Sequence, residues 1–205
     1  MIVKVCGMRD AQNIHEVELC GADWMGFIFF PTSARNIVTR PEYLPVSTRR
    51  VGVFVNANPE DITARAQEYG LDFIQLHGTE SPELCDGLKR QGLKIIKAFS
   101  VQSPDDFLQT NAYVPSCDYF LFDTPCKGYG GSGQQFDWDL LQHYHGQTPF
   151  LLSGGIRPES LEALSAFHHP SWAGIDLNSG FETSPGYKNI DTLKTFIKQF
   201  KTLQL

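Results

Sequence analysis

Eight short apolar runs, spread over the 205-residue chain, constrain the fold more than any other feature. They are apolar throughout rather than alternating, a pattern typical of parallel strands that are covered by helices. Amphipathic segments lie between them, such as Ile62–Tyr69, which follows the helix-start signal Asn58-Pro59-Glu60-Asp61, and Ser160–Phe167. The apolar runs are Ile2–Val5, Trp24–Phe29, Arg50–Val55, Phe73–Leu76, Ile95–Ala98, Tyr119–Phe122, Phe150–Leu152 and Ala173–Leu177.

This alternation predicts an α/β fold, a single (βα)8 TIM barrel that takes up residues 1–205 as one domain. A doubly wound open sheet is the alternative, because strand order cannot be read from one sequence. No short repeat, low-complexity tract or long polar linker divides the chain. Pro41 and Pro45 crowd the segment Arg40–Thr48, so we expect the helix after the second strand to be short or irregular.

Charge and composition favour a small-molecule partner. The 17 basic and 23 acidic residues give a net charge of −6, and no dense Lys/Arg run indicates nucleic acid or an anionic membrane. No apolar stretch approaches the ~20 residues that span a bilayer, and a strand-like run at the N-terminus leaves no room for a secretion signal. The five cysteines lack a CxxC pair, which argues against a disulfide framework or a metal site. We therefore expect a cytoplasmic protein.

Two side chains that can exchange protons occupy equivalent positions in the predicted barrel. Cys6 directly follows the run Ile2–Val5, and Asp123 directly follows Tyr119–Phe122. The carboxyl ends of all strands in a parallel barrel open at one mouth, so these two groups can face one substrate. The pair predicts an enzyme that uses acid–base chemistry.

Each of the two has a plainer interpretation. Cys6 could be a small buried hydrophobic residue, the interpretation that we prefer for Cys20 and Cys85 in helix-like segments. Asp123 could cap a turn or helix before Thr124-Pro125. The position of Cys6 at a strand end weakens the first interpretation, while for Asp123 the residues alone leave both open.

Glycines cluster after the last three strands, where backbone can approach a ligand closely. Barrel enzymes commonly bind phosphate between the loops after strands seven and eight, through backbone N–H groups. Ser153-Gly154-Gly155 and Asn178-Ser179-Gly180 suit this role, although one Gly-Gly pair alone more often marks a tight turn. Two adjacent loops of this kind favour a phosphate site.

A series of short motifs, in order along nearly the whole chain, resembles the phosphoribosylanthranilate isomerase family. The motifs are Val5-Cys6-Gly7-Met8, Gly26-Phe27-Ile28-Phe29, Ser33-Ala34-Arg35, Val51-Gly52-Val53-Phe54-Val55, Gln75-Leu76-His77-Gly78, Phe122-Asp123-Thr124, Gly130-Gly131-Ser132-Gly133, Leu152-Ser153-Gly154-Gly155 and Asp176-Leu177-Asn178-Ser179-Gly180. The resemblance implies an Amadori rearrangement in tryptophan biosynthesis, from an aminoaldose phosphate to an aminoketose phosphate, without a cofactor.

The resemblance also implies roles for individual residues. Cys6 resembles the general base of the family and Asp123 its general acid. Arg35 resembles the arginine that meets the anthranilate carboxylate, Asp176 lies where the substrate's amino nitrogen is expected, and His77 has a positioning role near the site. The plainer alternatives are a solvated loop cation for Arg35 and a helix cap for Asp176. The other substrate-binding residues implied are Gly131, Ser132, Gly154, Gly155, Ser179 and Gly180.

This chemistry requires that the pKa values of both proton carriers, Asp123 and Cys6, differ from those of the free side chains. An acid must protonate the furanose ring oxygen, and a base must then remove the proton from sugar C2. A free Asp has a pKa of about 3.9, so Asp123 needs partial desolvation or nearby negative charge to stay protonated. A free Cys has a pKa of about 8.5, so Cys6 needs a nearby cation or backbone dipoles to lose its proton.

Two residues depart from the family pattern: Cys126 adds a thiol beside the acid, and Asn36 stands where an aromatic residue is common.

Other interpretations of the sequence remain open. One is another sugar-phosphate isomerase or epimerase, including the histidine-pathway isomerase, and another is a non-catalytic phosphate-binding module. A third is a Schiff-base aldolase, for which Lys97 is the candidate lysine, although Lys97 is more simply a positioning cation or a rim residue. Nothing in the sequence chooses between a monomer and a homodimer.

Overall fold

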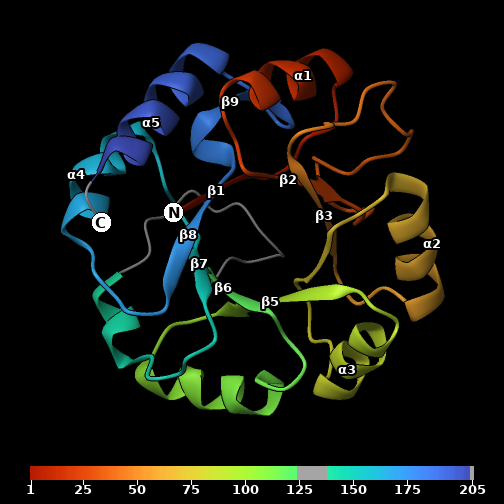
Figure 1. Ribbon diagram of the computed structural model, residues 1–205, viewed down its shortest axis with the longest axis vertical. Coiled ribbons are helices and arrows are strands. Elements are labelled where there is room, and N and C mark those ends of the chain that lie inside the picture. Colours follow the sequence, from red (N-terminus) through yellow and green to blue (C-terminus); the bar gives the residue numbers. More distant parts are fainter. Residues whose placement is uncertain (124–137, 204–205) are drawn as a thin grey trace.

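Eight parallel strands close into a barrel in the order of the sequence (Figure 1). The computed structural model describes residues 1–123 and 138–203. The first strand pairs with the second and also with the eighth, which confirms the barrel and excludes the open sheet. All eight predicted runs form strands, with ends that differ from the prediction by no more than two residues. The strands are β1 (Ile2–Val5), β2 (Trp24–Ile28), β3 (Arg49–Phe54), β4 (Phe73–Leu76), β5 (Lys94–Ser100), β6 (Tyr119–Asp123), β7 (Phe150–Leu152) and β8 (Trp172–Leu177).

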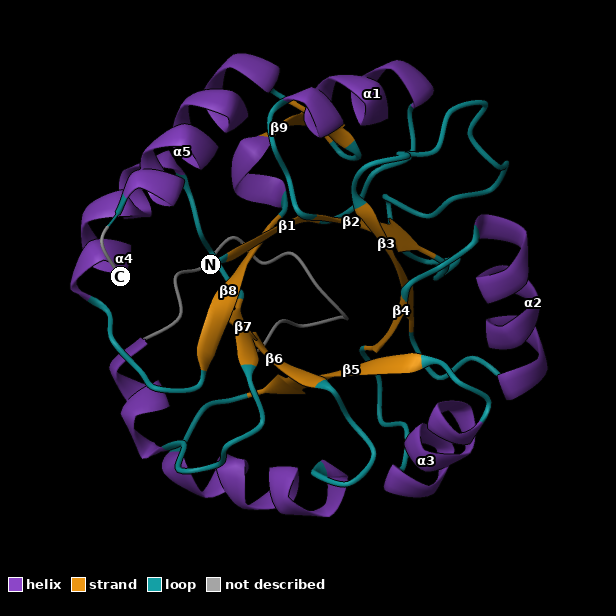
Figure 2. Cartoon of the chain, viewed as in Figure 1, coloured by secondary structure: helices purple, strands orange, loops and turns teal. Residues whose placement is uncertain are grey.

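Helices surround the barrel (Figure 2). Helix α2 begins earlier than predicted because Asn58 caps it, its side chain accepting a hydrogen bond from the Asp61 N–H at 2.8 Å. It ends at Gly70, whose φ of 57° is left-handed. After β5 and β6 the helices are of the 3-10 type. The helices are α1 (Ala11–Leu19), α2 (Pro59–Tyr69), α3 (Pro82–Arg90), η1 (Pro104–Tyr113), η2 (Trp138–His143), η3 (Pro158–Ser160), α4 (Leu161–Ala166), η4 (Ser179–Phe181) and α5 (Ile190–Thr202).

The connection from β2 to β3 contains no helix, in agreement with the two prolines in it. Glu18 at the end of α1 holds this connection in place. One of its carboxylate oxygens accepts hydrogen bonds from the backbone N–H groups of Val46, Ser47 and Thr48, and the other accepts from the Tyr43 hydroxyl. A single side chain thereby fixes the end of this helix-free connection against α1.

Apolar side chains pack on both sides of the barrel wall. A large cluster lies between the strands and the helices, and a smaller one fills the barrel interior. In the interior, Trp24 stacks on Phe73 with ring centroids 4.3 Å apart. The other buried members of the interior cluster are Val51, Ile96, Ala98, Leu121 and Leu151.

A short hairpin that the sequence analysis did not predict follows β8. It consists of β9 (Glu182–Ser184) and β10 (Tyr187–Lys188). The Asn13 side chain of α1 binds it twice, accepting from the Lys188 N–H at 2.8 Å and donating to the Lys188 carbonyl at 3.0 Å. Among the described residues, no helix combines the length and apolar character needed to cross a bilayer.

Candidate active site

Cys6 lies at the end of β1 in a tightly packed position. Its N–H donates to the Leu177 carbonyl at 2.8 Å, which continues the pairing of β1 with β8, and only 4% of the residue is exposed. A Cβ placed on Gly26 of β2 would lie 2.6 Å from the Cys6 Sγ. The missing side chain at Gly26 therefore makes room for the thiol.

Lys4 and Asp176 form a buried ion pair next to this thiol. They are register partners across β1 and β8, and the Lys4 Nζ lies 2.9 Å from the Asp176 Oδ1. Burial raises the pKa of Cys6 above its ordinary value, although the charges of Lys4 and Lys188 oppose the shift. Cys6 is therefore a thiol near neutral pH, with a buried cation beside it that favours its ionisation.

Asp176 lies between the two proposed proton carriers. Burial raises its pKa, the Lys4 ammonium lowers it, and the negative charge of Asp123 raises it further. The charge of Asp176 in turn raises the pKa of Cys6, against the effect of Lys4. The Asp176 carboxylate accepts a hydrogen bond from the Lys4 ammonium. The alternative interpretation, a cap on the helix that follows, is wrong, because Asn178 occupies the N-cap position of η4.

Asp123 lies beside His77, on the opposite arc of the barrel from Cys6. The His77 Nε2 is 3.5 Å from the Asp123 Oδ2, and both side chains are partly exposed. The Gln75 side-chain amide donates from Nε2 to the His77 Nδ1 at 2.9 Å. With Nδ1 as acceptor, a neutral imidazole carries its proton on Nε2, directed towards Asp123. His77 thus lies beside the proposed acid, and its positioning role stays a prediction.

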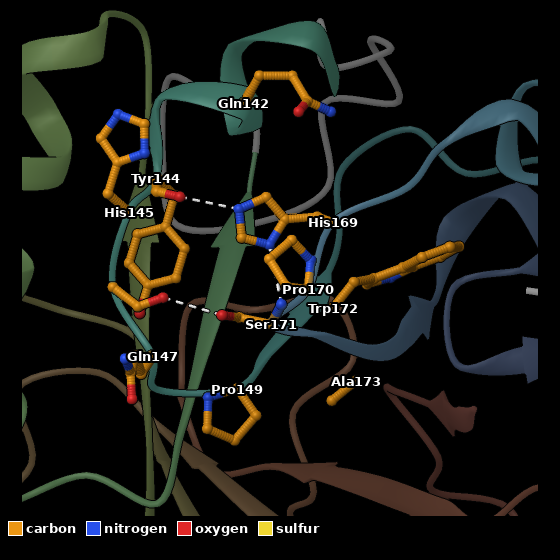
Figure 3. Close-up of a pocket in the computed structure, with 11 residues that line it drawn as sticks. Gln142, Tyr144, His145, Gln147, Pro149, His169, Pro170, Ser171, Trp172 and Ala173 are labelled. Carbon is orange, nitrogen blue, oxygen red and sulfur yellow. Dashed lines mark hydrogen bonds between the residues drawn. The ribbon is translucent and has the colours of Figure 1, made fainter.

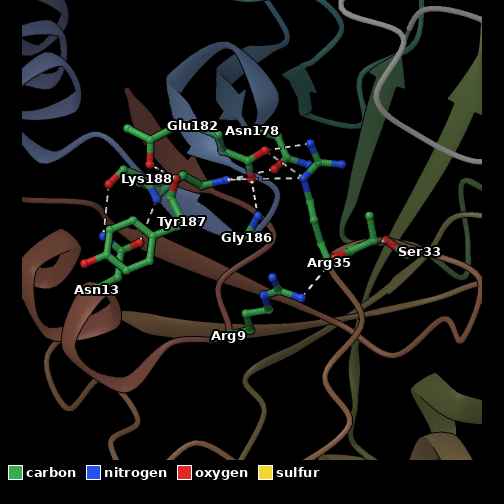
Figure 4. Close-up of polar contacts among 11 residues, drawn as sticks. Arg9, Asn13, Ser33, Arg35, Asn178, Glu182, Gly186, Tyr187 and Lys188 are labelled. Carbon is green, nitrogen blue, oxygen red and sulfur yellow. Dashed lines mark hydrogen bonds and ion pairs between the residues drawn. The ribbon is translucent and has the colours of Figure 1, made fainter.

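Arg35 is paired with a residue of the unpredicted hairpin (Figure 4). Its Nε lies 2.9 Å and 3.0 Å from the two Glu182 carboxylate oxygens, and its Nη2 lies 2.6 Å from one of them. A Cβ on Gly7, where φ is +77°, would lie 2.7 Å from the Arg35 Cδ. Arg35 therefore crosses the turn that follows Cys6 and is not a freely solvated loop cation.

The loops after β7 and β8 are in direct contact. A Cβ on Gly180 would lie 2.2 Å from the Ile156 carbonyl oxygen. Gly154 and Gly155 both have left-handed φ angles, 85° and 69°, which other residues rarely adopt. Ser179 begins the short helix η4 beside them. The two loops that carry the four residues predicted for this part of a phosphate site are thus in contact, and the role of these residues stays a prediction.

Some of the predicted residues lie outside the described part of the chain, namely Gly131, Ser132 and the extra thiol Cys126. Asn36 forms an isolated backbone bridge with Ile28 of β2. Of the four cysteines described, none is in a disulfide. The described residues contain no cluster of three or more His, Cys, Asp or Glu that could hold a metal ion.

Lys97 is not a rim residue, which corrects that part of the sequence analysis. It is 2% exposed, its Nζ lies 3.1 Å from a Glu80 carboxylate oxygen, and it also donates to three backbone carbonyl groups. A lysine whose amino group donates to so many acceptors has a structural role rather than that of a Schiff-base nucleophile.

A cavity of about 790 Å³ lies at the other end of the barrel (Figure 3). Its lining includes Pro149, which precedes β7, and Trp172, the first residue of β8. The His169 ring there already bonds on both sides, to the Ser171 N–H at 3.0 Å and to the Tyr144 carbonyl at 2.8 Å. This end of a barrel contributes to stability, whereas catalysis takes place at the carboxyl ends of the strands.

Sequence reasoning missed four polar residues of the site: Lys4, Gln75, Glu182 and Lys188. Lys4 and Gln75 each stand two positions before a predicted site residue, so strand alternation directs them to the same side of the wall. Nothing in the local sequence marked Glu182 or Lys188, because their roles depend on a hairpin folding back over β8.

A closed (βα)8 barrel with an acidic group, a thiol and a histidine at the carboxyl ends of its strands defines a barrel enzyme of the acid–base class. The family model described as N-(5'phosphoribosyl)anthranilate (PRA) isomerase matches residues 3–199, and the chain belongs to this family. The N-(5'-phosphoribosyl)anthranilate isomerase of Phocaeicola vulgatus is 59% identical over 201 residues, covering 98% of each chain.

Solved structures agree with this assignment. The phosphoribosyl anthranilate isomerase of Thermus thermophilus superposes with a TM-score of 0.85 at 29% identity, covering 100% of both chains. A phosphoribosyl anthranilate isomerase in complex with reduced 1-(o-carboxyphenylamino)-1-deoxyribulose 5-phosphate superposes with a TM-score of 0.80 at 33% identity, covering 99% of this chain and 100% of the other.

Proposed function

We propose that this enzyme converts N-(5-phosphoribosyl)anthranilate to 1-(2-carboxyphenylamino)-1-deoxyribulose 5-phosphate, an Amadori rearrangement in tryptophan biosynthesis, without a cofactor. One observation carries the proposal. Cys6 follows β1 beside the buried Lys4–Asp176 pair, and the Asp123 Oδ2 at the end of β6 lies 3.5 Å from the His77 Nε2, so both proposed proton carriers lie at the carboxyl ends of strands of one closed barrel. Such an arrangement suits a reaction that needs an acid and a base on one small substrate.

The reaction needs two proton transfers that these residues can make. Asp123 donates a proton to the furanose ring oxygen, the C1–O bond breaks, and a protonated imine forms. The Cys6 thiolate then removes the proton from C2, and the electron pair of the C–H bond forms the enolamine. Protonation at C1 and loss of the 2-hydroxyl proton complete the ketose. Because Cys6 rests as a thiol, the Lys4 ammonium is the group that favours the reactive thiolate.

The remaining residues bind the substrate in this proposal. Arg35 receives the anthranilate carboxylate, Asp176 lies near the amino nitrogen, and His77 holds Asp123 in place. The phosphate binds at the joined loops after β7 and β8, and the relative crystallised with a reduced carboxyphenylamino-deoxyribulose phosphate supports a ligand of this kind. The residues proposed to meet the phosphate are Gly131, Ser132, Gly154, Gly155, Ser179 and Gly180.

Two further expectations go with the proposal. Residues 1–205 form one domain, since the barrel begins at Ile2 and its last helix ends at Thr202. The enzyme acts in the cytoplasm, where free thiols such as that of Cys6 persist.

The test is turnover of phosphoribosylanthranilate carrying deuterium at sugar C2. The substrate is labile and is made in the cuvette, and the loss of its anthranilate fluorescence reports conversion. We expect an aminoketose phosphate that has lost the deuterium to solvent. A folded protein that leaves the substrate unchanged, but isomerises the histidine-pathway aminoaldose, would replace this proposal with the related activity.

A further inference from the structure

Arg35 belongs to a buried group of three charges rather than to a simple ion pair (Figure 4). Glu182 lies between two cations: its carboxylate accepts from Arg35, and its Oε1 lies 2.6 Å from the Lys188 Nζ. Lys188 also donates to the Asn178 side-chain oxygen at 2.9 Å. The group therefore joins the β2 connection, the end of β8 and the hairpin.

The three side chains differ in their access to solvent. Lys188 is fully buried, Glu182 is 5% exposed and Arg35 is 15% exposed. Glu182 occupies the Nε–Nη2 edge of the guanidinium, and no described residue accepts a hydrogen bond from Nη1. The Nη1–Nη2 edge thus remains for a planar acceptor such as a carboxylate.

The charge count of the group is unbalanced by one. With Lys188 protonated, two cations and one anion leave a net charge of +1, which one carboxylate would neutralise. Burial lowers the pKa of Lys188, and the charge of Glu182 and its hydrogen bond to Lys188 oppose that shift. Burial alone would raise the pKa of Glu182, but the hydrogen bond from Arg35 and the charge of Lys188 outweigh it, so the pKa lies below its ordinary value. The hydrogen bond to Glu182 likewise raises the pKa of Arg35, so both remain charged.

The hairpin holds this group in a fixed place. Asn13 binds both backbone groups of Lys188, and the Gly186 N–H donates to the Glu182 Oε1 at 3.1 Å. Gly186 has a φ of +83°, and a Cβ on it would lie 2.5 Å from the Arg9 Nε. The position of Glu182, and with it that of Arg35, is set before any ligand arrives.

We propose that Lys188 is a positioning residue that neutralises the charge of Glu182. Arg35, which Glu182 orients, then keeps its positive charge and its Nη1–Nη2 edge for the carboxylate of the substrate's aromatic ring. This inference rests on the proposed function, in which Arg35 receives that carboxylate. Without Lys188, Glu182 alone would balance the charge of Arg35, and an incoming carboxylate would meet a group with no net charge.

The experiment compares two ligands that differ only in this carboxylate. They are reduced 1-(o-carboxyphenylamino)-1-deoxyribulose 5-phosphate and the same compound with an unsubstituted phenyl ring. Their dissociation constants are measured by calorimetry for the wild type, Lys188→Met, and the double variant Lys188→Met with Glu182→Gln. Lys188→Gln, which can still donate to Glu182 but has no charge, replaces Lys188→Met if the latter does not fold.

For Lys188→Met we expect affinity for the carboxylate ligand to fall by about tenfold or more, and affinity for the phenyl ligand to change by less than about threefold. Adding Glu182→Gln removes the competing carboxylate, so part of the lost affinity should return. Recovery on a second substitution is the opposite of what accumulating structural damage would produce.

Lys97→Met is the matched control, because Lys97 forms a similarly buried pair with Glu80. It should leave the ratio of the two affinities unchanged. Equal losses for both ligands in Lys188→Met, or a further loss in the double variant, would overturn the inference. Both of these results concern the variants and are compatible with a wild type that turns over phosphoribosylanthranilate. Failure of the proposed function would instead appear as a wild type without turnover.

Discussion

Lys4 and Asp176 form an ion pair in the barrel interior, with the Lys4 Nζ 2.9 Å from the Asp176 Oδ1. Lys4 lies two residues before Cys6, so both side chains point to the same side of the barrel wall. A buried lysine in this place has a consequence for reactivity. The pKa of Lys4 is raised because Asp176 and Cys6 together outweigh its burial, so the ammonium stays charged. Its positive charge is available to stabilise a thiolate at Cys6.

Replacing Lys4 with Met should therefore make Cys6 harder to ionise. Burial already raises the pKa of Cys6, and the loss of the neighbouring cation raises it further. We expect the pH at which Cys6 reacts half-maximally with iodoacetamide to move upward, as followed by mass spectrometry of the Cys6 peptide. Lys97→Met, which alters a different buried pair, should not move it. The same profile in Lys4→Met and the wild type would exclude an electrostatic role for Lys4.

Gly26→Ala should displace the thiol without unfolding the barrel. The added Cβ would lie 2.6 Å from the Cys6 Sγ, so the side chain of Cys6 must move. We expect kcat to fall by about 100-fold or more, and the free energy of unfolding to fall by about 1–3 kcal/mol. Gly87→Ala is the control: a Cβ there meets nothing within 4 Å and should stabilise α3 by about 0.5–1 kcal/mol. Undiminished kcat in Gly26→Ala would show that the position of Cys6 is not critical.

His77→Asn should weaken catalysis through Asp123. The shorter side chain removes the group that lies 3.5 Å from the Asp123 carboxylate. Because His77 positions the acid and does not replace it, we expect kcat to fall by about 10- to 100-fold, less than in Asp123→Asn, while KM changes little. Steady-state kinetics of the two variants provide the comparison. A rise in KM at constant kcat would instead place His77 in ground-state binding.

Glu18 should make stability depend on pH in the acid range. Burial alone would raise its pKa slightly, but hydrogen bonds from Tyr43, Ser47 and Val46 lower it to about 2. The folded pKa lies below the unfolded value, so the stabilisation is complete above the unfolded pKa and disappears as the pH falls towards 2. Because the group is only partly buried, we expect Glu18→Gln to cost only about 1 kcal/mol at pH 7.

Urea denaturation at several pH values tests this expectation. The stability difference between the wild type and Glu18→Gln should shrink between about pH 5 and pH 2. A difference that does not change over this range would mean that the charge of Glu18 does not hold the connection between β2 and β3.

The sequence was sufficient to predict the barrel strands because each is a continuous apolar run, buried by helices on one side and by the interior on the other. Closure was harder to predict, since the pairing of β1 with β8 is a contact between the two ends of the chain. The 3-10 helices after β5 and β6 were also missed, because η2 has only six residues and the ten residues of η1 do not follow a clear amphipathic pattern.

The positions of Cys6, His77 and Asp123 at strand ends were predictable from the apolar runs, while their roles stay predictions. The charges that tune the site were not predictable. In the sequence, Lys4 only interrupts an apolar run, and its role depends on the ion pair with Asp176, which is distant in the sequence. Glu182 and Lys188 act on Arg35 only through the folded hairpin, a contact between distant parts of the sequence.

The most direct test of the acid–base assignment is to measure both turnover of phosphoribosylanthranilate and affinity for the reduced product analogue in the wild type, Cys6→Ala and Asp123→Asn. We predict that each substitution lowers kcat by at least about 1,000-fold while the dissociation constant changes by less than about threefold. Substantial turnover in either variant, or a parallel loss of turnover and affinity, would contradict the assignment of Cys6 and Asp123 as base and acid.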